Sequence, residues 1–180
     1  SIGTFNDNTR KILESLVSDR QNILVAGATG SGKTTLLNAL AGVIPYDQRI
    51  ILLEDTSELN IQHPHVVRFE CRPPNIEGEG EISLQQLLRA SLRMRPDRLL
   101  VGECRGKEAI DLLQALHTGH SGSMATIHAN SARDALARLE LLAATGGVSL
   151  QQEYLRAFVV AGIQAVVFTE KRNGHRRVSG

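Results

Sequence analysis

Short, continuously apolar runs alternate along the chain with longer segments in which apolar residues recur every three or four positions. The continuous runs are typical of strands buried on both faces, and the longer spacing is typical of amphipathic helices. The runs predict strands at residues 22–26, 49–54, 66–70, 98–102, 123–129 and 165–169. Helices are predicted within 6–21, from Leu36 to Gly42, from Ser83 to Pro96, from Ala109 to Gly119, and from Ser131 and Ser149 onward.

The alternating order of these elements predicts an α/β fold, with a mostly parallel sheet that carries helices on both faces. A turn at Asn173 and Gly174 predicts a terminal hairpin. The one long irregular connection is 72–81, where prolines and glycines disfavour regular structure. Helix caps are predicted by a serine three residues before Gln or Asp, at Ser83 with Gln86, Ser131 with Asp134, and Ser149 with Gln152.

The composition limits the number of domains. A chain of 180 residues with 42% hydrophobic and 22% charged residues can bury one sizeable core. We therefore expect a single domain over residues 1–180. Because the chain begins at Ser1 rather than Met and stops at Gly180 just after a turn, we expect a domain excised from a longer protein.

The charge and the apolar content disfavour some kinds of partner. Twenty Lys and Arg balance nineteen Asp and Glu, and aromatic residues make up 3%, so neither a broad basic surface nor a base-stacking platform is expected. We do not expect nucleic acid as the main substrate. No apolar run approaches the roughly 20 residues that cross a bilayer, so we expect a cytoplasmic protein without membrane insertion. Cys71 and Cys104 match no zinc spacing, and free thiols are favoured over a disulfide or a redox role.

One local motif carries specific chemistry. Residues 27–34 match the phosphate-binding pattern G-x-x-x-x-G-K-[ST] between a predicted strand and a predicted helix, a context that disfavours a chance glycine-rich turn. Glycines let backbone N–H groups close around phosphates, and the positive end of the following helix attracts the anion. Lys33 would reach the β- and γ-phosphates of ATP, and the Thr34 hydroxyl would contact Mg²⁺. The predicted nucleotide-binding residues are Gly27, Ala28, Thr29, Gly30, Ser31, Gly32, Lys33, Thr34 and Thr35.

Hydrolysis also needs a carboxylate that faces the γ-phosphate and orients water or accepts its proton. Glu103 ends one predicted strand and Glu54 ends another, with Asp55 and Glu58 close behind it. Open α/β sheets bind ligands at the carboxyl ends of their strands. One such acid alone would be read as a solvated strand end, but two beside a phosphate-binding loop favour a hydrolytic site.

A histidine and four arginines are further candidates. His128, near the carboxyl end of its strand, could hydrogen-bond the γ-phosphate or its attacking water, or could be a core or capping histidine. The arginines could be solvated, pair with acids, or stabilise charge on the transferring phosphoryl group, in cis or across a subunit boundary. They flank the strand that ends at Glu103, at Arg93, Arg95, Arg98 and Arg105. The six histidines have no ligand spacing, so we expect only the Mg²⁺ of the nucleotide.

Four segments, in this order, resemble signatures of the secretion and pilus-assembly ATPases, a family that includes conjugation-type, type II secretion and type IV pilus motors. Residues 27–35 resemble its Walker A loop, 53–59 its Asp box, 92–103 its Walker B region and 118–131 its His box. The likeness covers nearly the whole chain. Within the family, residues 72–80 and 131–140 resemble the Tad (Flp) pilus ATPases of the CpaF type.

The resemblance implies a RecA-like P-loop NTPase and a homo-hexamer that binds ATP and Mg²⁺ at subunit boundaries. It also implies inner-membrane pilus or secretion platform proteins as partners, with the motor peripheral to that membrane. Glu103 would be the Walker B acid and a Mg²⁺ site with Thr34, Glu54 would help to activate water, and His128 would sense phosphate. As is usual in the family, Gly102 replaces the common Asp before Glu103. An N-terminal domain would contribute further arginines.

The function predicted from these residues is an ATP-hydrolysing motor for Tad pilus assembly or protein secretion. A conjugation or type IV secretion ATPase of the same family is the nearest alternative. From other classes, the alternatives are a P-loop phosphotransferase and a nucleotide-binding module that does not hydrolyse. The phosphotransferase is disfavoured because the sequence shows no arginine-rich lid segment.

Overall fold

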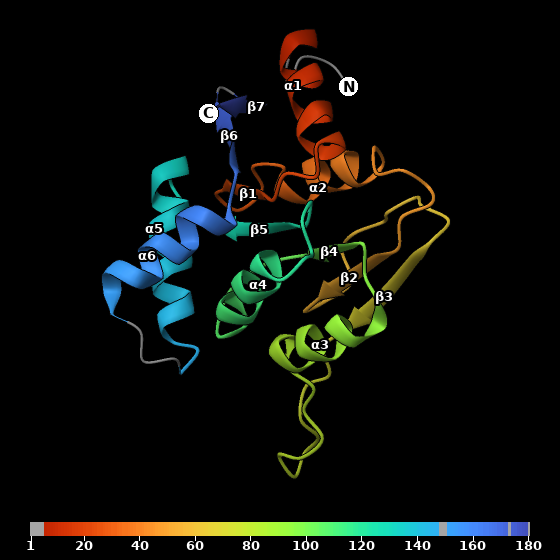
Figure 1. Cartoon of the computed structure of the whole chain (residues 1–180), viewed down its shortest axis with the longest axis vertical. Helices are drawn as coiled ribbons and strands as arrows, with labels where there is room; N and C mark the ends of the chain where they lie inside the picture. The colour runs from red at the N-terminus through yellow and green to blue at the C-terminus, as the bar shows by residue number, and fades with distance from the viewer. Residues whose placement is uncertain (1–5, 148–150, 173, 180) are drawn as a thin grey trace.

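The apolar runs form the strands of a sheet in the computed structural model, which describes residues 6–147, 151–172 and 174–179 (Figure 1). The strands are β1 (Ile23–Gly27), β2 (Ile50–Glu54), β3 (Val66–Glu70), β4 (Arg98–Val101), β5 (Met124–His128), β6 (Ala165–Arg172) and β7 (His175–Ser179). The helices are α1 (Asp7–Ser18), α2 (Lys33–Ala41), α3 (Leu84–Ser91), the short 3-10 helix η1 (Leu92–Met94), α4 (Glu108–His117), α5 (Ala132–Ala144) and α6 (Gln152–Gly162).

The strands of the described chain lie in the order β3-β2-β4-β5-β1-β6-β7. Every neighbouring pair is parallel except β6 and β7, which pair antiparallel with Arg172 opposite His175. This confirms the mostly parallel sheet and the terminal hairpin, although Asn173 of the predicted turn lies outside the described residues. The parallel order brings the carboxyl ends of β1, β2, β4 and β5 to one edge of the sheet.

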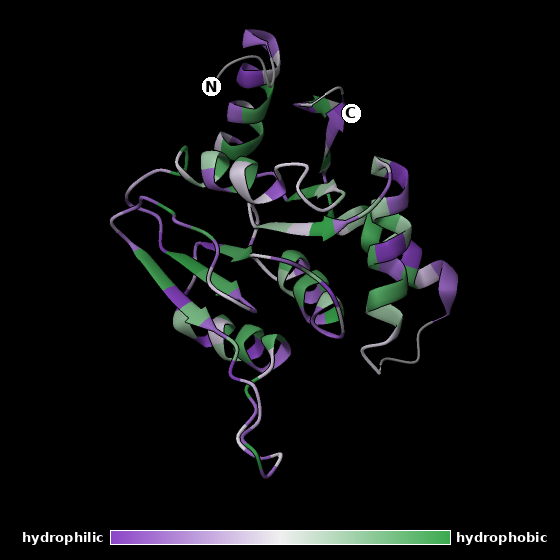
Figure 2. Cartoon of the chain, turned by 180° about the vertical axis from the view of Figure 1, so that it is seen from behind, coloured by the Kyte–Doolittle hydropathy of each residue, from purple (hydrophilic) through white to green (hydrophobic). Residues whose placement is uncertain are grey.

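Two layers of helices cover the sheet because successive strand residues point to opposite faces. Leu24 and Ala26 of β1 pack with apolar residues of α3, α4, α5 and α6, whereas Ile23 and Val25 pack with those of α1 and α2. Figure 2 shows the strands mostly in the green of hydrophobic residues, between helices that carry purple, hydrophilic residues on their outer sides. The predicted helices on both faces are thus confirmed.

Helix caps position the segments around the sheet. Ser83 and Gln86 form the predicted capping box of α3, and Ser131 Oγ accepts a hydrogen bond from Asp134 N at 3.0 Å. Ser149 lies outside the described residues, and α6 instead follows Gln151, which makes no side-chain cap. The caps that the structure describes therefore agree with the sequence pattern at two of the three predicted places.

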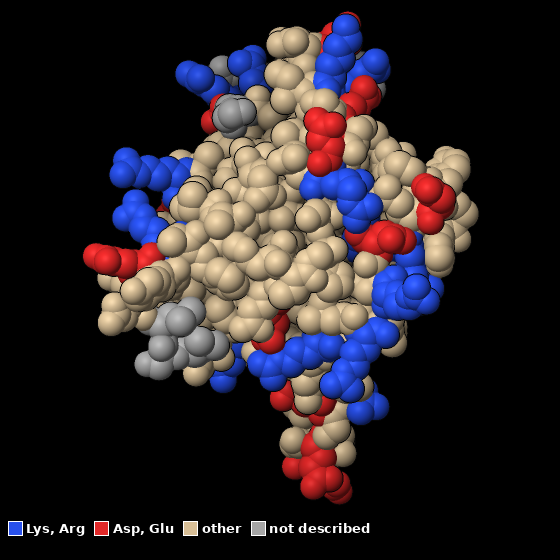
Figure 3. Space-filling view, in the orientation of Figure 1, with Lys and Arg blue, Asp and Glu red and all other residues tan. Residues whose placement is uncertain are grey.

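The irregular connection is an arm, residues 72–82, that projects from the body of the protein (Figure 1). Its base is closed by two backbone hydrogen bonds between Arg72 and Ile82, of 3.0 and 2.8 Å. Near its tip, Asn75 Oδ1 accepts hydrogen bonds from the backbone N–H groups of Glu77 and Glu79. In Figure 3 the projection carries red, acidic residues at its end. The arm lacks helix and strand, as predicted, and is held by its own hydrogen bonds.

Candidate active site

Glycines give the phosphate-binding loop between β1 and α2 its path. A Cβ on Gly27 would lie 2.3 Å from the backbone oxygen of Thr169 in β6, so only glycine lets the two strands approach this closely. Gly30 and Gly32 have φ angles of 72° and 104°, a left-handed conformation that side chains disfavour. The loop therefore turns directly into α2, whose first residue is Lys33.

A buried serine ties this loop to β6. Ser31 Oγ lies 2.8 Å from Thr169 Oγ1, and the Thr169 hydroxyl donates to the carbonyl of Ala26 at 3.1 Å. Because Thr169 has a single hydroxyl hydrogen, Ser31 is the donor of their shared bond. The Ser31 side chain thus links the loop to β6, and its hydroxyl group is buried in that contact.

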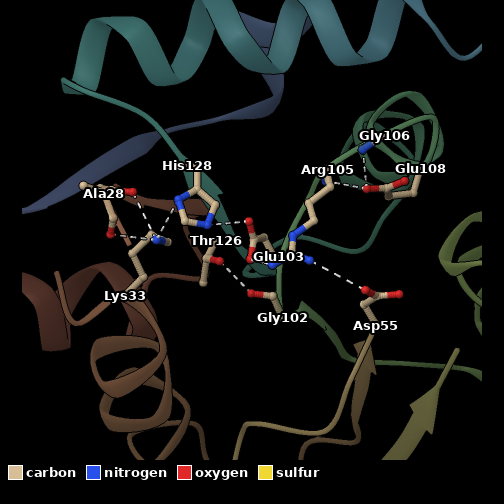
Figure 4. A network of polar contacts seen from close by, with 11 residues as sticks. Ala28, Lys33, Asp55, Gly102, Glu103, Arg105, Gly106, Glu108, Thr126 and His128 are labelled. Carbon is tan, nitrogen blue, oxygen red and sulfur yellow. Dashed lines mark hydrogen bonds and ion pairs between the residues drawn. The ribbon is translucent and has the colours of Figure 1, made fainter. Parts of the chain in front are cut away.

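Lys33 lies inside the curve of the loop (Figure 4). Its Nζ donates to the carbonyls of Gly27 at 3.1 Å and Ala28 at 3.0 Å, and lies 3.4 Å from His128 Nδ1. Burial lowers the pKa of Lys33, and the nearby Glu103 carboxylate opposes part of that shift. The ammonium group therefore stands at the meeting point of the loop and of β5, as its predicted role requires.

Glu103 follows β4, and its two carboxylate oxygens differ. Oε2 accepts a 2.6 Å hydrogen bond from Arg105. Oε1 lies 2.8 Å from His128 Nε2 but without the angles of a hydrogen bond, so within the described chain this buried oxygen has no hydrogen-bond partner. Burial is the main cause that lowers the pKa of His128, which keeps the imidazole neutral at pH 7. A buried carboxylate oxygen without a donor fits a cation or a bound water.

Glu54 ends β2 and is 4% exposed. Its Oε1 accepts hydrogen bonds from the backbone N–H groups of Glu58 at 3.0 Å and Leu59 at 2.9 Å. These bonds fix the carboxylate at the carboxyl edge of the sheet. A Cβ on Gly102 would lie only 3.0 Å from Glu54 Cγ, so the glycine before Glu103 makes room for the Glu54 side chain. The sequence had shown Gly102 only as the loss of an aspartate.

A cavity of about 190 Å³ joins these groups. It lies at the carboxyl edge of the sheet, where the parallel strand order places the candidate acids. Its lining comes from the phosphate-binding loop, the ends of β2, β4 and β5, and the segments that follow them, with Thr29, Gly30, Lys33, Thr34, Glu54, Asp55, Thr56, Glu58, Leu59, Gly102, Glu103, Arg105, Thr126 and His128. The structure thus brings Lys33, Thr34, Glu54, Glu103 and His128 together in one pocket.

Of the four candidate arginines, Arg98 is fully buried at the start of β4 and does not line the pocket, and the other three separate into two groups. Arg105 reaches the pocket, where it contacts Glu103 and lies 3.6 Å from Asp55 Oδ2. Arg93 and Arg95 are exposed near the amino end of β4, at the opposite edge of the sheet, and do not line the pocket within this chain. A role for them across a subunit boundary stays a prediction.

Sequence reasoning missed Thr126. This residue lines the pocket, and its Oγ1 donates to the carbonyl of Gly102 at 2.6 Å, which links β5 to the residue before Glu103. The signal was available, because residues two apart on a strand share a face and Thr126 lies two positions before His128.

The sheet order, the two helix layers and the loop around Lys33 define a P-loop nucleotide-binding domain of the RecA-like α/β type. Residues 1–165 match the family described as "Type II/IV secretion system protein". The chain belongs to this family.

Named relatives agree with this membership. The chain is 43% identical over 178 residues to a Mycobacterium tuberculosis (strain H37Rv) protein named for conjugal transfer, covering 98% of this chain and 50% of the relative. It is 46% identical over 158 residues to the type IV secretion system protein PtlH of Bordetella pertussis, covering 84% and 46%. The crystal structure of the Brucella suis VirB11 ATPase from a type IV secretion system, in complex with sulphate, superposes with a TM-score of 0.87 at 35% identity and covers 96% and 51%. The chain therefore spans about half the length of these proteins.

Among residues 6–147, 151–172 and 174–179, no helix combines the length and the apolar character that a bilayer crossing needs.

Proposed function

We propose that this chain is the ATP-hydrolysing motor domain of a pilus-assembly or secretion machine, and more specifically of a Tad (Flp) pilus. The observation that carries the proposal is the meeting of Lys33, His128 and Glu103, with contacts of 3.4 and 2.8 Å along the edge of the loop. A loop that only binds phosphate has no need of an acid with one unpartnered oxygen. Membership in the secretion family supports the same reaction.

In the proposed reaction, each group acts from the place where the fold holds it. The loop and Lys33 bind the β- and γ-phosphates of ATP, with Lys33 exchanging its carbonyl partners for phosphate oxygens. The Glu103 carboxylate orients the attacking water and takes its proton. Glu54, whose carboxylate is fixed by two backbone N–H groups, lines the same pocket and helps to activate that water. Neutral His128 donates a hydrogen bond to the γ-phosphate and reports its release.

The residues also fit a magnesium ion. Thr34 and Glu103 both line the cavity, and the buried Oε1 of Glu103 has no hydrogen bond from the described residues. A hydroxyl and a carboxylate are oxygen ligands of the kind that Mg²⁺ takes beside phosphates. When bound, the ion neutralises charge on the β- and γ-oxygens.

The assembly and the location follow from the same proposal. Because the chain spans about half of its relatives, we place it as a single domain beside an N-terminal domain in a longer protein. That protein forms a homo-hexamer, works on the cytoplasmic side of the inner membrane, and reaches the membrane through pilus or secretion platform proteins. The likeness of residues 72–80 and 131–140 to Tad pilus ATPases supports a Tad pilus as the machine that this motor drives.

A conjugation or type IV secretion ATPase is the second candidate. It is favoured by the names of the relatives, since one is named for conjugal transfer and another for type IV secretion. Neighbouring genes separate the two candidates. Pilin and inner-membrane platform genes beside this gene support the Tad pilus, and conjugation genes support the second candidate.

Phosphate release from the full-length protein with Mg-ATP, in the absence of any acceptor, tests the proposal. Glu103→Gln is expected to keep ATP affinity within about twofold and to lower turnover by at least about 100-fold, because it removes the base and leaves the binding loop intact. Glu79→Gln on the arm is the matched control and should leave both unchanged. Absence of release from the wild-type protein, or a Glu103→Gln variant with normal turnover, would refute hydrolysis at this site.

A further inference from the structure

One side chain of the terminal hairpin contacts the phosphate-binding loop. Arg176 of β7 donates from Nε to the carbonyl of Gly30 at 3.2 Å. Its aliphatic stem covers the loop as well, since a Cβ on Gly32 would lie 3.0 Å from Arg176 Cδ. None of the described residues offers Arg176 a carboxylate within ion-pair distance. Among the described residues, the exposed Arg176 guanidinium has this one hydrogen-bond partner, and it lies directly beside a loop built for anions.

The strand order indicates which part of a bound nucleotide Arg176 can contact. The acids and His128 come from β2, β4 and β5, which all lie on one side of β1. Arg176 comes from the other side, where β6 and β7 extend the sheet. A triphosphate whose γ-phosphate faces Glu103 and His128 therefore crosses the loop with its nucleoside directed toward β6 and β7.

Arg176 contacts the loop beside the described cavity and is not one of the residues that line it. The residues that line the described cavity include no Phe, Tyr or Trp. A guanidinium is planar, stays charged and stacks on aromatic faces, which makes it a substitute for an aromatic side chain. The bond to Gly30 holds this plane in place before a ligand arrives, which reduces the entropy lost on binding.

We propose that Arg176 forms a nucleoside-binding subsite, in which its guanidinium stacks on the purine base of the bound nucleotide. The subsite rests on the proposed function, because it extends the same nucleotide site. It makes the terminal hairpin part of the nucleotide site, although the family match ends at residue 165.

Calorimetric titration with three ligands tests the subsite without requiring hydrolysis. In the full-length protein, Arg176→Ala should weaken ATP and ADP about tenfold, which is the scale of a lost cation–π contact. Inorganic tripolyphosphate has no base, and its affinity should stay within about twofold. Arg176→Lys keeps the charge without the plane and should recover less than half of the lost affinity on a logarithmic scale.

The matched control is Arg177→Ala, because Arg177 is the next residue of β7, carries the same charge and points to the opposite face. It should leave the affinity for all three ligands unchanged. An equal loss for tripolyphosphate, full recovery by Arg176→Lys, or no loss in Arg176→Ala would each overturn the base contact. A wild-type protein that binds neither ATP nor tripolyphosphate would instead refute the proposed function, so the two failures are distinguishable.

Discussion

The two ends of β4 each carry a charged side chain, and the two are held in opposite ways. At the amino end, Arg98 is fully buried and donates three hydrogen bonds, to Gln48 Oε1 at 2.7 Å and to the carbonyls of Gly122 and Val17 at 3.0 Å. Burial lowers its pKa to about 10, so it remains charged at pH 7. At the carboxyl end, Glu103 keeps one oxygen without a hydrogen bond from the described residues.

The difference in hydrogen bonding distinguishes a charge with a structural role, at Arg98, from a charge with a proposed functional role, at Glu103. Each of the three guanidinium nitrogens of Arg98 has a hydrogen-bond partner, and these bonds link α1, β4 and the turn before β5. A buried ion with an unsatisfied oxygen costs stability unless a ligand completes it. Arg98 and Glu103 lie five residues apart, so it is the hydrogen bonds, rather than the neighbourhood in sequence, that distinguish the two roles.

Removing the structural charge should have the largest effect. Arg98→Met is expected to lower the free energy of unfolding by about 3 kcal/mol, because it leaves the Gly122 and Val17 carbonyls buried without their donor. Chemical denaturation measures the loss. Arg93→Met replaces an exposed arginine nearby and should stay within about 0.5 kcal/mol of the wild type. Equal stability of the two variants would show that the Arg98 bonds do not hold the end of β4.

The second prediction concerns the functional end. His128→Gln should lower turnover about 30-fold, because it removes the group that lies between Lys33 and Glu103, while unfolding changes little. Steady-state phosphate release measures turnover, and His120→Gln, outside the cavity, serves as the control. A variant that loses stability but keeps normal turnover would show that His128 has a structural role and not a role in hydrolysis.

The sequence predicted the parts of the site that are contiguous or that depend on strand ends. The phosphate-binding loop is one segment, and apolar runs place Glu54, Glu103 and His128 at strand ends whose parallel order makes them converge. Strand direction could also have separated the arginines, because Arg93 and Arg95 precede β4 whereas Arg105 follows it. The contact of Arg176 with Gly30 could not be predicted, because it depends on the position of β7 two strands away from β1.

The third prediction tests the spacing beside Glu103. Gly102→Ala should lower turnover about fivefold to tenfold, since the new methyl group would displace the Glu54 side chain by a few tenths of an ångström. Gly106→Ala, where a Cβ would lie 3.2 Å from the end of the Glu108 side chain, is the control and should be milder. Turnover equal to wild type in Gly102→Ala would mean that Glu54 tolerates the shift.

The smallest expected effect is a dependence on pH. Burial holds the pKa of folded His128 below its ordinary value of 6.5, so the unfolded state takes up a proton first as the pH falls. The free energy of unfolding should therefore decrease from pH 6.5 down to the folded pKa, and not above that window. Denaturation of the wild type and of His128→Gln between pH 5 and pH 8 measures it. A parallel pH profile in the two proteins would assign the decrease to other groups.

Both outer strands of the sheet carry charge along their length. On one side β3 presents Arg68 and Glu70, and on the other β7 presents Arg176 and Arg177, all exposed. Charged residues on edge strands disfavour the edge-to-edge pairing that leads to aggregation. If copies of this chain assemble as proposed, these charges disfavour the joining of their sheets through β3 or β7.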